Sequence, residues 1–254
     1  GNCSNMSFLW RIFLTLLLAP LLLRPPAQAA SETALRVAVL ENSPPMAFRD
    51  AAGEFTGFSV TIMRALCEEM KVVCHYQVTT LDRVIDDVAG GEVDVAAVSL
   101  LDTPERRARV LLSKPYFRSI SLWFAAAGVQ PGQHGVRVAV VRGSAQERFA
   151  RNKGWDIIAV RTNGELAEPL IAGVAQAVIS PMSTGLNLMK KPEFQQLGLA
   201  STVMKEPELG GDASFGITPR RPALKEQIDA ALDRIKRNGT YDRINSRFLP
   251  FRVN

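Results

Sequence analysis

One strand that leads directly into a capped helix constrains the fold of this chain more than any other feature. Residues 93–98 form an apolar run that is typical of a buried strand. Thr103 followed by Pro104 predicts a helix start, because a threonine hydroxyl caps a helix and proline suits its first position. Residues 99–102 are then expected to form a strand-to-helix turn at the carboxyl end of a strand, where open α/β sheets bind ligands.

Arg106 falls in the first turn of this predicted helix, close to the backbone N–H groups that we expect the turn to leave free. Its guanidinium carries a fork of donors that matches a carboxylate. The simpler interpretation is an ordinary turn with a solvated arginine, and the turn alone leaves both interpretations open.

The pattern of strand, turn and helix recurs along the chain and predicts an α/β fold with mostly parallel sheets. Strands are expected at residues 35–40, 72–78, 93–98, 136–141, 157–160 and 175–180. Helices are expected from Ser59 to Met70 and at residues 81–88, 144 onward, 165–171, 224–235 and 241–248. The apolar run 120–127 is long enough to carry the chain from one α/β series to a second, and residues 210–217 form a second crossing.

The first 30 residues have the pattern of a cleaved secretory signal. Arg11 supplies the positive region, residues 12–23 the apolar core, and residues 27–29 a small-residue cleavage site. We expect the mature chain to begin near residue 30 or 31, in the periplasm, after residues 1–30 as signal peptide and N-terminal remnant. A retained N-terminal anchor is the alternative.

Charge and composition exclude some classes of partner. The formal charge of the whole chain is +5, and removal of Arg11 and Arg24 leaves 28 basic against 25 acidic residues, a charge of +3. This charge is too small, and too evenly spread, to indicate nucleic-acid binding. His75 and His134 each lack a second ligand at metal spacing, so no metal or cofactor is expected.

Cys67 and Cys74 remain in the mature chain, within a short helix-to-strand connection. In an exported protein such a pair favours a disulfide, and two buried free thiols are the alternative.

The order of short motifs resembles that of a known family, the exported solute-binding proteins of ABC importers for polar amino acids (bacterial extracellular solute-binding family 3). The markers run from about Leu35 to Phe248 and are the segments 43–48 (SPPMAF), 57–60 (GFSV), 91–95 (GEVDV), 103–106 (TPER), 114–116 (KPY), 142–146 (RGSAQ) and 238–241 (NGTY). The resemblance implies two lobes joined by two crossing strands, the type II periplasmic-binding-protein fold. Lobe 1 would hold residues 31–118 and 216–254, and lobe 2 residues 119–215. Cys67 and Cys74 also fall close to the disulfide of the basic amino-acid binders.

The resemblance also implies a function, which is capture of an amino acid or related small carboxylate and its delivery to a membrane permease by a monomeric protein. Arg106 matches the family's arginine for the ligand α-carboxylate. The same comparison implies supporting contacts from Ser99, Leu101 and Thr103 on lobe 1 and from Ser144, Ala145 and Gln146 on lobe 2.

The sequence departs from the family pattern where the ligand's other groups would bind. Pro181 stands where the family usually has an aspartate for the α-ammonium, so either Asp212 or Glu41 substitutes or the ligand lacks a normal α-amine. Ser43 replaces an aromatic that often stacks on the ligand. Phe48 remains either as a ligand contact or as core. Leu81 matches a position that is apolar in the basic amino-acid binders. Such a pocket is less acidic and more apolar than a lysine or arginine side chain requires, so we expect a carboxylate with a small or apolar remainder.

Two other functions remain open at this point. The same fold hosts exported cyclohexadienyl and arogenate dehydratases, which need a cleft acid such as Glu41, Asp102 or Asp212 as proton donor. A ligand-sensing subunit for a membrane receptor would use the same closure of the lobes.

Overall fold

The computed structural model describes residues 34–252, and the predicted signal segment lies outside them. The first sheet has the strand order β4-β1-β5-β13-β6, and β7 also pairs with β13. Its strands are β1 (Ala34–Leu40), β4 (Val73–Thr79), β5 (Val95–Leu101), β6 (Leu111–Leu112), β7 (Phe117–Ser119) and β13 (Gly211–Ile217). β1 runs parallel to β4 and β5, whereas β13 is antiparallel to its three partners.

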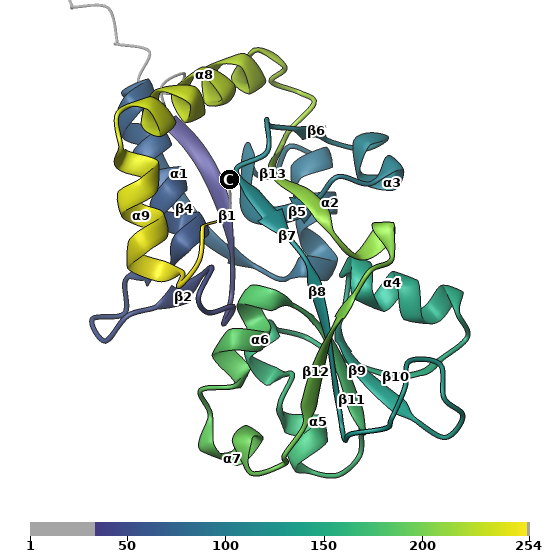
Figure 1. Ribbon diagram of the computed structural model, residues 1–254. Helices are drawn as coiled ribbons and strands as arrows, with labels where there is room; N and C mark the ends of the chain where they lie inside the picture. The colour runs from purple at the N-terminus through teal and green to yellow at the C-terminus, as the bar shows by residue number, and fades with distance from the viewer. Residues whose placement is uncertain (1–33, 253–254) are drawn as a thin grey trace, which may run out of the picture. The chain divides into compact units, whose positions relative to one another are not determined.

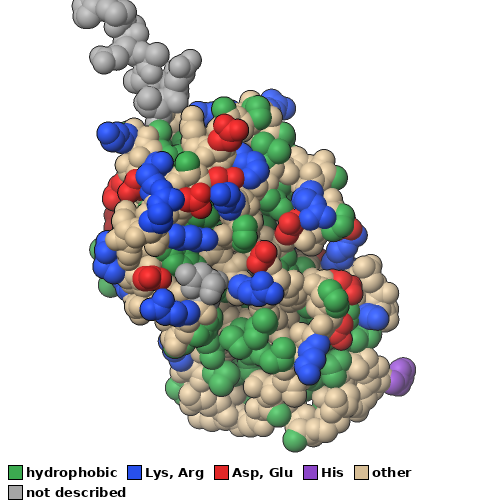
Figure 2. Space-filling model, turned by 45° about the horizontal axis from the view of Figure 1, so that its top comes forward, with side chains coloured by type: hydrophobic (Ala, Val, Ile, Leu, Met, Phe, Trp, Pro, Cys, Tyr) green, Lys and Arg blue, Asp and Glu red, His purple; other side chains and the backbone are tan. Residues whose placement is uncertain are grey.

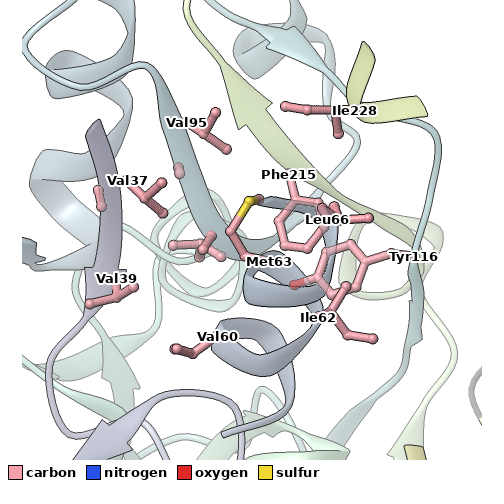
Figure 3. Close-up of a cluster of buried hydrophobic side chains, with 14 of the residues drawn as sticks. Val37, Val39, Val60, Ile62, Met63, Leu66, Val95, Tyr116, Phe215 and Ile228 are labelled. Carbon is pink, nitrogen blue, oxygen red and sulfur yellow. The ribbon is translucent and has the colours of Figure 1, made fainter. Parts of the chain in front are cut away.

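Helices α1, α8 and α9 contact one another beside this sheet (Figure 1). The helices of this lobe are α1 (Phe58–Met70), α2 (Leu81–Ala89), α3 (Pro104–Arg107), α8 (Ala223–Arg237) and α9 (Thr240–Phe248). The apolar faces of α1, α2, α8 and α9 and the strands enclose one core, in which the rings of Tyr116 and Phe215 stack 3.8 Å apart (Figure 3). A short hairpin, β2 (Phe48–Arg49) and β3 (Phe55–Thr56), precedes α1.

The second sheet has the strand order β10-β9-β11-β8-β12. Its strands are β8 (Ser121–Ala125), β9 (Arg137–Val141), β10 (Asp156–Val160), β11 (Ala177–Pro181) and β12 (Ala200–Met204). Residues alternate between two cores: Phe124 packs in one and its neighbour Trp123 in the other. This period of two is that of a strand covered on both faces. The covering helices are α4 (Ala145–Asn152), α5 (Glu168–Ile171), α6 (Met182–Leu188) and α7 (Pro192–Gln195), with the 3-10 turns η1 (Asn163–Glu165) and η2 (Pro207–Leu209).

The chain passes between the sheets twice, from β7 to β8 and back from β12 to β13. The two-lobed α/β fold is therefore confirmed. The sheets are more mixed than the predicted mostly parallel arrangement, because both crossing segments pair antiparallel. We call the part built on the first sheet lobe 1 and the part built on the second sheet lobe 2.

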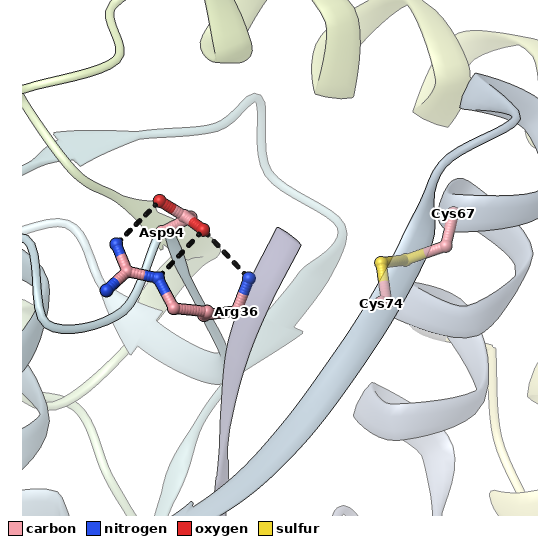
Figure 4. Close-up of a disulfide and its surroundings, with 4 residues drawn as sticks. All are labelled: Arg36, Cys67, Cys74 and Asp94. Atoms are coloured by element: carbon pink, nitrogen blue, oxygen red, sulfur yellow. Dashed lines mark hydrogen bonds and ion pairs between the residues drawn. A yellow bond between two sulfur atoms is a disulfide. The ribbon is translucent and has the colours of Figure 1, made fainter. Parts of the chain in front are cut away.

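Two further features of lobe 1 stabilise the first sheet (Figure 4). Cys67 in α1 and Cys74 in β4 form a disulfide, which confirms the pairing expected from export. The Asp94 carboxylate, only 5% exposed, accepts hydrogen bonds from the backbone N–H and the guanidinium of Arg36. Burial raises the pKa of Asp94, but these hydrogen bonds and the charges of Arg36 and Arg221 outweigh it, and the net pKa lies below its ordinary value.

Within residues 34–252, no helix is both long enough and apolar enough to cross a bilayer. Basic and acidic side chains lie interspersed over the face shown in Figure 2.

Candidate functional site

A pocket lies where the carboxyl ends of strands from both sheets meet. Lobe 1 contributes Leu40, Ser43, Met46, Ala47, Ser59, Leu81, Ala97, Val98, Ser99, Leu101 and Arg106. Lobe 2 contributes Ser144, Ala145, Gln146, Asn163, Pro181, Ser183 and Thr184, and β7 of lobe 1 adds Phe117 and Ser119. A ligand in this pocket would contact both lobes at once.

Arg106 is held in the pocket by the local structure that the sequence predicts. Thr103 caps α3, and its hydroxyl accepts a hydrogen bond from the backbone N–H of Arg106 at 3.3 Å. The guanidinium donates to the carbonyl of Leu101 at 3.1 Å and, across the lobes, to that of Gly143 at 3.5 Å. Burial lowers the pKa of Arg106 to about 10, an effect that Glu105 opposes and Arg148 increases. Arg106 is therefore still a cation at neutral pH.

No carboxylate in the described part of the chain forms an ion pair with Arg106. The neighbouring Glu105 pairs instead with Arg148 of lobe 2 at 2.8 Å, and Arg107 pairs with Asp102. Arg106 is thus a partly buried cation whose planar fork is available to an anion from outside the protein.

Ser99 is fixed by a buried hydroxyl network. The hydroxyl of Tyr116 lies 2.8 Å from the hydroxyls of both Ser59 and Ser99, and the two serine oxygens are 3.3 Å apart. Burial raises the pKa of Tyr116, and the two serine hydrogen bonds only partly offset this rise. The network is consequently neutral, and it orients two hydroxyls that line the pocket.

Lobe 2 faces Arg106 with the start of α4. Ser144 caps this helix, since its hydroxyl accepts from the backbone N–H of Glu147 at 3.0 Å. The buried side-chain amide of Gln146 donates to Ser121 at 2.9 Å, and Ser121 in turn donates to the carbonyl of Leu209. This chain of hydrogen bonds fixes Gln146 beside the pocket.

Direct contacts join the lobes at the rim of the pocket. Asn163 donates to the hydroxyl of Ser43 at 2.8 Å. The side-chain amide of Asn42 donates to the hydroxyl of Thr162 at 3.1 Å, and its backbone carbonyl accepts from the backbone N–H of Gly164 at 2.9 Å. A salt bridge of 2.8 Å joins Arg161 to Glu41 on lobe 1. The structure is therefore a closed arrangement, in which the two lobes touch on more than one side of the pocket.

The sequence of residues 35–251 matches the family model of the bacterial extracellular solute-binding proteins, family 3. The chain belongs to this family. The sequence resemblance given by the short motifs is thereby confirmed.

Curated relatives of this family 3 protein span nearly its whole length. The lysine/arginine/ornithine-binding periplasmic protein of Escherichia coli K12 is 26% identical over 236 residues, which cover 89% of this chain and 91% of the relative. The L-arginine-binding protein of Pseudomonas aeruginosa is 25% identical, with 88% and 91% covered. The histidine-binding periplasmic protein of Salmonella typhimurium is 23% identical, with 89% and 92% covered.

Solved structures share the fold. An ancestral arginine-binding protein bound to arginine has a TM-score of 0.75 and 24% identity, with 85% of this chain and 98% of that chain covered. An ancestral amino-acid-binding protein that is a precursor of cyclohexadienyl dehydratase has a TM-score of 0.73 and 23% identity, with 86% and 96% covered.

The structure brings together most of the residues singled out in the sequence. The predicted site residues that line the pocket are Arg106, Ser99, Leu101, Ser144, Ala145, Gln146, Ser43, Leu81 and Pro181. Thr103 lies beside it, in an adjoining groove that also contains Arg106. Phe48 lines a separate hollow together with Glu41, and Asp212 is 55% exposed and paired with Arg118. Neither Glu41 nor Asp212 lines the pocket, so neither replaces the missing aspartate in this arrangement.

Five polar residues of the pocket lie outside the predicted set: Ser59, Ser119, Asn163, Ser183 and Thr184. The last three follow the carboxyl end of a strand, Asn163 after β10 and the other two after β11. The rule that located the turn after β5 could have located them as well.

The turn predicted at residues 99–102 is wrong in part, because β5 continues through Leu101 and pairs there with Ala213 of β13. The segment 99–102 therefore offers fewer free backbone N–H groups to the pocket than the sequence predicted. The Arg106 guanidinium supplies the positive charge of this half of the site.

The pocket lining contains one ionisable side chain, Arg106, among hydroxyl, amide and apolar groups. Within residues 34–252, no group of three His, Cys, Asp or Glu side chains is arranged to hold a metal ion.

Proposed function

We propose that this protein captures an amino acid or related small carboxylate between its two lobes and delivers it to the membrane permease of an ABC importer. The observation that carries the proposal is Arg106, a cation without an ion-pair partner among the described residues, in a pocket that both lobes line. A ligand that touches both lobes stabilises the closed form, and a permease can distinguish that form from the open one.

The proposal includes the organisation inferred from the sequence. Residues 31–118 and 216–254 would move as one body and residues 119–215 as the other, except that residues 211–215 belong to β13 of the first sheet and would move with the first body. The segments between β7 and β8 and between β12 and β13 would be the hinges. The protein would act in the periplasm as a monomer, after removal of residues 1–30, and would require no cofactor. The names of the curated relatives, which are amino-acid-binding periplasmic proteins, support this proposal.

We favour binding over catalysis for a chemical reason. A dehydratase needs a group that gives a proton to the leaving hydroxyl. The pocket residues include no Asp, Glu or His, and Glu41, Asp102 and Asp212 are each paired with an arginine outside the lining. The likeness to a dehydratase precursor therefore extends to the fold, and we do not extend it to the reaction.

Calorimetric titration of the refolded protein tests the proposal, because refolding removes any ligand acquired in the cell. The panel contains the standard amino acids and small carboxylic acids, each tested on wild type, Arg106→Ala and Arg107→Ala. Arg107 is a matched control, since it is exposed, pairs with Asp102 and does not line the pocket.

We expect Arg106→Ala to weaken binding by about 100-fold, because a bidentate charge-assisted pair contributes about 3 kcal/mol. We expect Arg107→Ala to bind like wild type. Equal binding by wild type and Arg106→Ala would contradict the proposed function.

A further inference from the structure

The charges that surround the pocket indicate which carboxylates fit it, and this inference rests on the proposed function. Arg106 is the one charged side chain of the lining. A carboxylate without an amine neutralises that charge, whereas a zwitterionic amino acid leaves one positive charge in excess. Within the described part of the chain, no acid lines the pocket to balance an ammonium group.

The three acids expected near the cleft from the sequence each pair with an arginine that does not line the pocket. Glu41 pairs with Arg161 at 2.8 Å, Asp102 with Arg107, and Asp212 with Arg118 at 3.4 Å. A carboxylate that moved into the pocket would leave its arginine unpaired. At Pro181, the backbone ends β11 with a side chain that neither carries charge nor accepts a hydrogen bond.

Two buried hydroxyls of the pocket are available to a neutral ligand group. Ser183 is 2% exposed and Ser119 is 6% exposed, and their side chains make no hydrogen bond to any described residue. A hydroxyl donates as well as accepts, so it satisfies a ligand keto or hydroxyl oxygen without adding charge. An ammonium group only donates and would still need an anion.

The space in the pocket favours a short ligand. The pocket volume is about 70 Å³ in the closed arrangement, which leaves room for a small ligand. The side chains of Leu40, Met46, Leu81 and Phe117 make part of the wall apolar, which suits a short aliphatic remainder.

We infer that the ligand is a small carboxylic acid with a hydroxyl or keto oxygen, and no amine, on the carbon next to the carboxylate. Arg106 binds the carboxylate. Ser119 and Ser183 hydrogen-bond the neutral oxygen, and Pro181 excludes the ammonium group that an aspartate there would bind.

Matched ligands with the same carbon skeleton test the inference by calorimetry on the refolded protein. One set is L-alanine, L-lactate and pyruvate, and a second is L-valine, 2-hydroxyisovalerate and 2-oxoisovalerate. We expect at least one amine-free acid to bind about 100-fold more tightly than the amino acid of its set.

The variant Pro181→Asp introduces a carboxylate at the position where the family usually has an aspartate. Pro181 is the N-cap residue of α6 with φ −55° and ψ 147°, and aspartate is among the preferred N-cap residues, so we expect this variant to fold. It should weaken the amine-free acid and strengthen the amino acid, each by about tenfold or more. Pro222→Asp, at the start of α8 and outside the pocket, adds the same charge as a control and should leave both affinities unchanged.

The outcomes separate this inference from the proposed function. Tighter binding of an amino acid than of its amine-free matches, with loss in Arg106→Ala, overturns the inference and leaves the proposed function standing. Binding that does not depend on Arg106, or no binding of any acid of either class, overturns both. An unchanged preference in Pro181→Asp overturns the role of Pro181.

Discussion

The substitution Gly143→Ala tests whether ligand binding needs the closed arrangement seen here. Gly143 lies in the turn between β9 and α4 of lobe 2, with φ +82°. A Cβ at this position would lie 2.5 Å from the Cα of Asp82 and 2.6 Å from its backbone nitrogen. These atoms begin α2 of lobe 1, so the added methyl group meets backbone across the pocket rim.

The size of the effect follows from the overlap. Ordinary contact begins at about 3.4 Å, so the turn and α2 must separate by about 0.9 Å. Such overpacking costs about 1–3 kcal/mol in the closed form, which corresponds to about 5- to 150-fold in Kd. In the open form the added methyl group does not meet α2. The open form is then destabilised only by the left-handed backbone conformation of the alanine, by about 1 kcal/mol.

Gly154→Ala is the matched control, because Gly154 also lies in lobe 2 with φ +72° but has no atom within 4 Å of its ideal Cβ. Without ligand, both variants should lower the Tm by about 2–4 °C, as about 1 kcal/mol does in a chain of this size. Titration with the tightest-binding acid should then show weaker binding for Gly143→Ala alone. Equal affinities of the two variants would refute the argument that the bound form brings Gly143 against Asp82.

Three further predictions concern stability. Tyr116→Phe removes the hydroxyl that bonds two serines of the pocket, so we expect a loss of about 1–2 kcal/mol in the free energy of unfolding, measured in urea, and weaker ligand binding; unchanged values would contradict the network. Reduction of the Cys67–Cys74 disulfide, whose residues are separated by 7 positions, should lower the free energy of unfolding by about 2.5 kcal/mol, and identical urea curves with and without reductant would disprove this. Asp94→Asn should cost about 1–3 kcal/mol at pH 7. Because the pKa of Asp94 is lowered in the folded state, its contribution is present above about pH 4, the ordinary value, and is lost as the pH falls through the lowered pKa. The difference between wild type and Asp94→Asn should therefore shrink in urea titrations below pH 4, and a difference that grew there would contradict the assigned direction.

Local signals predicted those parts of the fold that local interactions determine. The caps at Thr103 and Ser144 lie where a hydroxyl precedes a helix, and both accept the expected backbone hydrogen bonds. The apolar runs of the first strands are buried, as periodicity indicated. The disulfide follows from export and from the short spacing of its cysteines.

Weak local signals explain the elements that the sequence did not reveal. β12 is exposed at four of its five residues, so it lacks an alternating apolar pattern. α6 contains Gly185, a poor helix former, and a Cβ there would lie 2.8 Å from the ring of Phe124. The requirement for glycine at position 185 therefore comes from tertiary packing against Phe124. No pattern within the helix sequence predicts that requirement.

The candidate site was predictable only in part, for a related physical reason. Arg106 and the Ser144 turn carry signals in their own segments, whereas Asn163 joins the site through a hydrogen bond to Ser43, 120 residues away. The placements of Phe48 and Asp212 outside the lining depend on the hairpin β2–β3 and on the pair with Arg118. The contact between Asn163 and Ser43 forms only when the lobes close, and no single segment of the sequence encodes that closure.

The proposed function depends most on Arg106, which would bind a ligand carboxylate between the lobes. The most direct test is a crystal structure of the protein with the acid that binds most tightly. We predict that both carboxylate oxygens lie within hydrogen-bond distance of the Arg106 guanidinium, with the remainder of the ligand between Leu81 and Pro181. A ligand bound elsewhere, or bound here with its carboxylate turned away from Arg106, would contradict the account.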